Sequence, residues 1–240
     1  MARRKRTRPL RRLVLVTLLI VGVWLGVEVL TWPDVAALRR EDPTTTAFIE
    51  RWKDRRREAG MRADVDRRVV PYSRISAHLK RAVLVGEDVN FFSHHGFEVA
   101  EMKVALREAL DDRELPRGAS TITQQLAKNL WLSPSRDPLR KVKEAILTRQ
   151  LEAALPKRRI LEVYLNVVEF GPGVYGAEAA ARRYFGKPAA ELDEPEAAAL
   201  AAALPNPDGW NPSTGSRTAA ARREKLLRRM ARAEFLWREI

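Results

Sequence analysis

Apolar residues recur along most of this chain at helical spacing. One apolar run, interrupted only by Glu28, extends from Leu13 to Trp32 and has about the 20 residues that a helix needs to cross a bilayer. From Ile75 onward, apolar positions return every three or four residues, which is the period of an amphipathic helix. Turns are expected at Gly171–Gly176 and Pro205–Pro212, and there is little strand signal. The pattern predicts one mostly α domain with helices over residues 75–88, 99–110, 121–130, 139–155, 156–165, 176–184, 195–204 and 218–237.

These patterns divide the chain into four parts. Residues 1–12 form a basic tail, 13–32 a transmembrane helix, 33–72 a polar, Arg-rich connector, and 73–240 the globular domain. The tail holds seven cations and no acid, which predicts a single-pass protein of the cytoplasmic (inner) membrane with its N-terminus inside and its domain on the periplasmic, outer side. Glu28 lies near the far end of the span, where it can reach the headgroups. A cleaved secretory signal is the alternative, but the run is long for one and no small-x-small site follows it.

The charge and the residue types narrow the function. The net charge is +13, and the seven cations of the tail leave +6 for the remainder. Apart from an ordinary solvated surface, this excess suits an anionic membrane, a phosphorylated substrate or nucleic acid. No nucleic-acid motif is present, so no nucleic-acid partner is expected. The chain has no cysteine, which excludes disulfides, thiolate nucleophiles and Cys-ligated zinc.

A first polar island, GEDVNFFSHHG, covers Gly86–Gly96. Two acids at the end of a helix oppose its dipole, so structure alone gives little reason for Glu87 and Asp88. A carboxylate beside two phenylalanines can act as a general base near neutral pH, although surface decoration is the simpler alternative. The neighbours His94 and His95 lack HExxH spacing, so zinc is not expected. His94 is expected to take a hydrogen-bonded structural role near Glu87.

Two further islands follow. The stretch GASTITQQLAKN, Gly118–Asn129, carries more hydroxyls and amides than a buried helix can satisfy, which favours binding of an oxygen-rich sugar or phosphate. In the stretch 136–152, Arg140 and Glu144 are four residues apart and share a helix face. They form either a surface ion pair worth under ~1 kcal/mol or part of a phosphate site with Lys128 and Arg136, because the arginine fork matches phosphate oxygens.

The three islands and the stretch Ile160–Asn166 resemble motifs of the family 51 peptidoglycan glycosyltransferases. EDVNFFSHHG resembles ED-x-x-F-x-x-H-x-G, GASTITQQ resembles G-G/A-S-T-I-T-Q-Q, RKVKE resembles R-K-x-x-E, and ILEVYLN resembles I-L-E-x-Y-L-N. With the closing helix at Glu196–Pro207, the matches cover about residues 70–212 in the family order. No S-x-x-K or K-T-G transpeptidase motif follows, so the resemblance implies a monofunctional biosynthetic transglycosylase. It also implies a lysozyme-like, mostly α fold with a small membrane-proximal jaw lobe near Phe97–Pro116, where Phe97, Val99, Met102 and Leu115 are expected to touch lipid.

The resemblance further implies a reaction and its site. The sugar 4-hydroxyl of lipid II attacks the anomeric carbon of a glycan chain on undecaprenyl pyrophosphate, with inversion. Glu87 is implied as general base, and Glu144 lies by the pyrophosphate, with a divalent cation (Mg or Mn) or with neighbouring cations; no organic cofactor is expected. The expected partners are lipid II, the glycan chain, membrane lipid, and transpeptidases or division proteins. The implied substrate-binding residues are Asp88, Phe91, His94, Ser120, Thr121, Gln124, Lys128, Asn129, Arg136 and Arg140.

Two other classes compete with this interpretation. A lytic enzyme acting on the same polymer would share the fold class and a catalytic glutamate, but it needs no pyrophosphate-binding cations such as Lys128, Arg136 and Arg140. A membrane-anchored binding module with a basic surface leaves Glu87 and Glu144 unexplained. The cations therefore favour a phosphorylated donor over hydrolysis by water.

Overall fold

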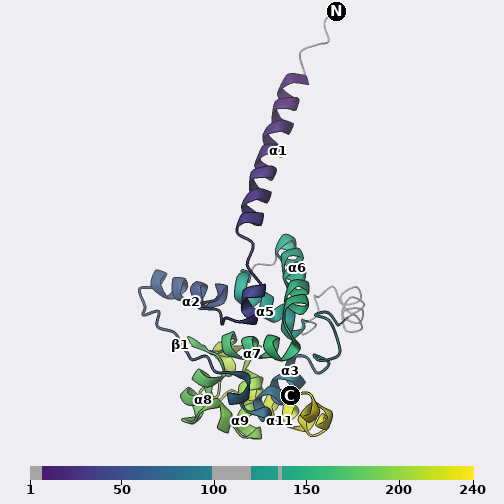
Figure 1. The fold of residues 1–240 in the computed structure, drawn as a ribbon. Helices are drawn as coiled ribbons and strands as arrows, with labels where there is room; N and C mark the ends of the chain where they lie inside the picture. Colours follow the sequence, from purple (N-terminus) through teal and green to yellow (C-terminus); the bar gives the residue numbers. More distant parts are fainter. Residues whose placement is uncertain (1–6, 99–119, 135–136) are drawn as a thin grey trace, which may run out of the picture. The chain divides into compact units, whose positions relative to one another are not determined.

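The computed structural model describes residues 7–98, 120–134 and 137–240, which form two compact units, 1–34 and 35–240 (Figure 1). The main described element of the first unit is the helix α1, Thr7–Leu30. Large apolar side chains on it are exposed, among them Leu13 at 63% and Leu30 at 87%. Within the described residues, no helix reaches both the length and the mean hydropathy of a membrane span.

The second unit is mostly helical, as expected. All seven predicted helices that fall in its described part are present, whereas the one expected at 99–110 and most of the expected jaw lobe lie outside the described residues. The last predicted helix is shorter than expected, because it ends at Met230 and a 3₁₀ turn follows. The elements are η1 Ala36–Arg39, α2 Ala47–Glu58, β1 Asp66–Arg67, η2 Tyr72–Arg74, α3 Ala77–Glu87, α5 Ile122–Trp131, α6 Pro138–Ala154, α7 Lys157–Val167, β2 Glu169–Gly171, β3 Val174–Tyr175, α8 Ala177–Phe185, η3 Ala189–Glu191, α9 Glu194–Ala203, α10 Pro207–Trp210, α11 Arg217–Met230 and η4 Glu234–Arg238.

The expected connector is folded against the domain from Val35 onward. Arg159 of α7 donates to the carbonyls of Leu38 and Glu41, at 2.8 and 3.0 Å. Arg39 donates to the carbonyl of Ala154 at the end of α6. The segment therefore belongs to the same compact unit as the helices that follow it.

The centre of the second unit is α3, which packs against α9 and α11, while α5 packs against α6 and α7. Residues 79–85 of α3 are all buried. All alanines of α9 except Ala199 are buried as well, and their small side chains allow the helix backbones to approach closely. This arrangement brings the end of α3, the start of α5 and the middle of α11 together.

A small sheet of order β1-β3-β2 closes one side of the helices. The predicted turn at 171–176 is the connection of the β2–β3 hairpin and the start of α8, so part of it is strand. Asn166, which is fully buried, accepts from Val70 N–H and donates to Val70 C=O. Gly176 has φ +85°, and a Cβ there would lie 2.8 Å from the Asn166 carbonyl oxygen. The I-L-E-x-Y-L-N stretch thus fixes the sheet to α7.

Candidate active site

Glu87 is the last residue of α3, and two other helices hold its carboxylate. Gln125 Nε2 of α5 donates to Oε2 at 2.9 Å, and Arg222 of α11 donates to Oε1 at 3.2 Å. The Tyr164 hydroxyl of α7 donates to Gln125 Oε1 at 2.8 Å, which orients the amide. The Glu87 side chain is 13% exposed. It is therefore a fixed carboxylate with limited access to solvent.

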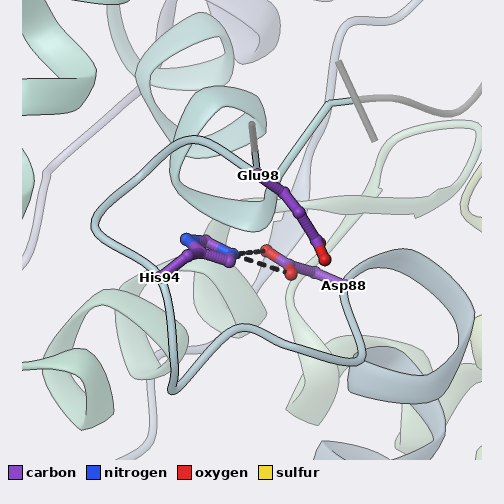
Figure 2. A group of neighbouring side chains, drawn as sticks. All are labelled: Asp88, His94 and Glu98. Atoms are coloured by element: carbon purple, nitrogen blue, oxygen red, sulfur yellow. Dashed lines mark hydrogen bonds and ion pairs between the residues drawn. The ribbon is translucent and has the colours of Figure 1, made fainter. Parts of the chain in front are cut away.

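The next residue, Asp88, ties the loop after α3 to the start of α5. Its carboxylate accepts from His94 Nε2 at 2.9 Å (Figure 2) and from the Ile122 N–H at 2.9 Å. His94 Nδ1 accepts from the Gly96 N–H at 3.1 Å, so the neutral ring carries its proton on Nε2. The predicted structural hydrogen bonding of His94 beside Glu87 is confirmed.

Glu98 approaches the same pair. A carboxylate oxygen of Asp88, a carboxylate oxygen of Glu98 and a ring nitrogen of His94 lie within 4.8 Å of one another, as the ligands of a metal ion would (Figure 2). A histidine that binds a metal must offer a nitrogen lone pair, but the Nδ1 lone pair of His94 accepts from Gly96 and its Nε2 carries the proton. The hydrogen bonds of His94 therefore fit a structural network better than a metal site.

Part of the polar island at the start of α5 is buried. Thr121 and Gln124 form a reciprocal capping box at the helix start, and the Thr121 hydroxyl donates to the Gly96 carbonyl at 2.7 Å. Both side chains are buried, so these groups hold the fold together. The remaining predicted residues differ in burial: Phe91 is fully buried, Asn129 is 8% exposed, Ser120 is half-buried, and Arg136 lies outside the described residues.

Glu144 lies on the inner face of α6 with its side chain only 3% exposed. Arg140 donates to Oε2 at 2.7 Å, and Lys141 pairs with Oε1. The predicted contact between Arg140 and Glu144 is confirmed, and its burial separates it from an ordinary surface pair.

Lys128 of α5 is influenced by the charges of both acids. Burial lowers the pKa of Lys128, while the charge of Glu144 and, more weakly, that of Glu87 act in the opposite direction. No hydrogen bond or ion pair holds its ammonium group among the described residues; its nearest aromatic neighbour is the Phe48 ring, 5.8 Å away. Lys128 and Gln125 are one turn apart on α5, so one face of this helix carries both the amide that binds Glu87 and a half-buried cation.

Three residues of this arrangement were not among the predicted ones. Gln125 and Tyr164 belong to the T-I-T-Q-Q and I-L-E-x-Y-L-N stretches, so their motifs were a signal. Arg222 lies in a highly charged helix, 135 residues from its partner Glu87, and nothing in its local sequence distinguishes it from its neighbours.

Comparisons with known proteins show the family to which the chain belongs. Residues 55–231 match the family model described as Transglycosylase, so the chain belongs to the transglycosylase family and is a glycosyltransferase. Among its curated relatives, it is 46% identical to the biosynthetic peptidoglycan transglycosylase of Thiobacillus denitrificans, over 88% of each chain. It is also 47% identical to the protein of that name from an Azoarcus species, over 90% of this chain and 91% of the relative.

Proposed function

We propose that this enzyme extends peptidoglycan by transferring a lipid-pyrophosphate-linked glycan onto lipid II, with Glu87 as general base. The enzyme polymerises peptidoglycan glycan chains. The observation that carries the proposed chemistry is the face of α5, where Gln125 binds Glu87 and the half-buried cation Lys128 follows one turn further on, under the influence of the charges of Glu144 and Glu87. Two acids with a cation near them suit a reaction that removes a proton and releases an anion.

In the proposed step, Glu87 accepts the proton of the sugar 4-hydroxyl of lipid II. The hydroxyl oxygen forms a bond to the anomeric carbon of the donor, with inversion. The bond from that carbon to the pyrophosphate oxygen breaks, and the leaving group keeps the electron pair. Gln125 and Arg222 hold the Glu87 carboxylate in one orientation, which preserves the alignment that such a displacement needs.

The departing pyrophosphate carries the charge that the cations neutralise. Among the described cations near Glu144, Lys128 and Arg140 are the two that would bind it, and Arg136 joins them by its motif. A divalent cation, Mg or Mn, would be held by Glu144 and the pyrophosphate oxygens, and would supply charge neutralisation there; magnesium is commonly bound by a single carboxylate together with substrate phosphates.

We also propose that residues 13–32 anchor the enzyme in the cytoplasmic membrane, with the tail inside and the domain on the outer side. Support comes from the seven cations before an apolar run in the sequence and from the exposed apolar side chains of α1. The lysozyme-like arrangement with a jaw lobe around 97–116 belongs to the same proposal, as does recruitment of transpeptidases or division proteins.

Glu87→Gln tests the proposed role of Glu87. The full chain in nonionic detergent is incubated with lipid II, and the glycan products are separated on a gel. Loss of the base is expected to lower the rate by about 10²–10⁴-fold, while Glu224→Gln, at an exposed position of α11, keeps the rate of the unchanged enzyme. Near-normal polymerisation by a folded Glu87→Gln enzyme would remove Glu87 from this role. Release of sugar fragments from finished peptidoglycan would instead indicate a lytic enzyme.

A further inference from the structure

Lys80 of α3 is a buried lysine that the proposed reaction does not use. It is only 6% exposed, although a lysine is almost never buried to this extent unless it is paired. Its Nζ lies 3.8 Å from the centroid of the Tyr72 ring on η2. The ring face attracts the cation but offers no oxygen to its three N–H groups. Among the described residues, no hydrogen bond or ion pair supplies that oxygen.

The hydroxyl of Tyr72 is a second donor at the same place. Its oxygen is buried and has no hydrogen-bond partner within the described part of the chain, whereas buried polar groups are normally bonded. Burial raises the pKa of Tyr72, so the hydroxyl keeps its proton and can donate at neutral pH. Because the Lys80 ammonium lies directly over the ring that carries this hydroxyl, one ligand with two oxygens can reach both donors.

The charges around the two donors favour an anion. Arg158 and Glu162 are four residues apart on α7 and so share a helix face. Burial lowers the pKa of Lys80, and the charge of Arg158 lowers it further, with a larger effect than the opposing charge of Glu162. Arg158 also outweighs Glu162 at the Tyr72 hydroxyl. Glu162 is itself paired with Arg159, whose Nη1 donates to it at 2.7 Å. The local potential is therefore positive although an acid is near.

We infer that Lys80, Tyr72 and Arg158 form a binding site for a small oxyanion, a phosphate or a carboxylate group. Its oxygens would accept from the ammonium and the hydroxyl, and its charge would be neutralised by the guanidinium. Arg158 is exposed, and its Nη2 donates to the Glu239 carbonyl at 3.2 Å, which holds the side chain in place. A bound oxyanion would link η2, α3 and α7. Lys80 lies two helical turns, about 10 Å, before Glu87, so this site is separate from the proposed active site.

Reductive methylation with formaldehyde and cyanoborohydride measures the access to each amine. The full chain, in nonionic detergent and triethanolamine chloride buffer, receives phosphate, acetate or chloride at equal ionic strength, and mass spectrometry of its peptides gives the rate at each lysine. Phosphate or acetate at ten times its dissociation constant is expected to slow the methylation of Lys80 by about tenfold, because about a tenth of the sites remains free. The exposed Lys225 should react equally fast in all three salts.

The pattern of protection identifies the ligand. Protection of Lys80 by phosphate alone indicates a phosphate site, and protection by both anions indicates a site for either oxyanion. Equal rates of Lys80 methylation in phosphate, acetate and chloride would overturn the inference. Protection of Lys128 without protection of Lys80 would overturn it too, while supporting the proposed pyrophosphate site.

Urea unfolding tests the same site without chemical labelling. Phosphate or acetate in place of chloride is expected to raise the urea midpoint of the unchanged protein more than that of Lys80→Met, whose unbranched apolar side chain fills the same space. Lys225→Met, at an exposed position of α11, controls for the loss of one cation. Equal gains for Lys80→Met and the unchanged protein would contradict the inference.

Tyr72→Phe keeps the ring and removes only the hydroxyl. It should raise the oxyanion concentration that gives half of the stabilisation by about fivefold, since one hydrogen bond is lost. Tyr175→Phe is the matched control, because it removes another buried hydroxyl that has no partner among the described residues, and it should leave this concentration unchanged. The same concentration for Tyr72→Phe and the unchanged protein would exclude the hydroxyl from the site.

Discussion

Glu169 gives the protein a pH-dependent stability that can be calculated from its surroundings. Its carboxylate lies on β2, and Oε1 is buried without a hydrogen-bond partner among the described residues. Burial, and then the negative charge of Asp208, raise the pKa of Glu169 from the ordinary value of 4.5 to about 7. The folded protein therefore binds this proton more tightly than the unfolded chain does.

The sign and size of the effect follow from linkage. An acid whose pKa is raised by folding adds to stability at pH values below 4.5, where it is protonated in both states, and this contribution is lost as the pH rises to about 7. A tenfold change in proton affinity is worth about 1.4 kcal/mol, so the loss amounts to roughly 3 kcal/mol. Glu169→Gln stays neutral at every pH, and its amide oxygen can still accept from the Gly173 N–H. At pH 8 the variant is expected to be more stable than the unchanged protein by up to about 3 kcal/mol, with the difference vanishing near pH 4.

Urea unfolding of the full chain in detergent, followed by tryptophan fluorescence between pH 4 and pH 8, measures this difference. Glu58→Gln, at an exposed position of α2, controls for the general loss of one negative charge. Asp208→Asn should shift the pH dependence toward lower pH, because it removes the second cause of the raised pKa. Parallel curves for Glu169→Gln and the unchanged protein across the whole range would refute the reasoning.

Three further substitutions test the contacts that hold the site. Arg222→Ala should lower the rate of polymerisation in the lipid II gel assay by about tenfold, because one of two groups orienting the base is lost. Arg222→Lys should recover part of this rate. The same loss of rate in Arg229→Ala would show a non-specific charge effect. Asp88→Asn should lower the free energy of unfolding in urea by about 2 kcal/mol, since a buried charged acceptor is removed, and an unchanged midpoint would count against the network. Gly176→Ala should lower the free energy of unfolding by more than about 2 kcal/mol, because a Cβ would meet a carbonyl oxygen at 2.8 Å. Gly60→Ala, also at positive φ but with no atom within 4 Å, should lower it by only about 1 kcal/mol. Equal losses of stability would exclude the collision as the cause.

Local spacing predicted the helices and one contact of the site. Arg140 and Glu144 are four residues apart, so a helix brings them together wherever it lies. Their burial was not predictable in this way, because it depends on how α5 packs against α6. The same limit applies to Arg222, whose contact with Glu87 spans 135 residues.

The polar island on α5 shows where a composition argument reaches too far. The number of hydroxyls and amides favoured binding of an oxygen-rich sugar or phosphate by this stretch. Thr121 and Gln124 instead satisfy one another in a capping box, and a threonine followed three residues later by glutamine is itself a sequence signature of that motif. Gln125 and Lys128 remain as the side chains of the proposed site. Each of them follows a residue of the capping box by one turn of the helix.

The two halves of that island depend on each other. The capping box and the bond from the Ile122 N–H to Asp88 fix the start of α5 against the loop after α3. That attachment places Gln125 within 2.9 Å of Glu87, since both residues sit next to the anchored ends of their helices. A substitution at Thr121 or Asp88 should therefore lower the turnover rate without contact with substrate, by releasing the base from its amide partner. It should affect the rate at saturating lipid II more than the concentration needed for half saturation, because alignment of the reacting groups is lost while most binding contacts remain.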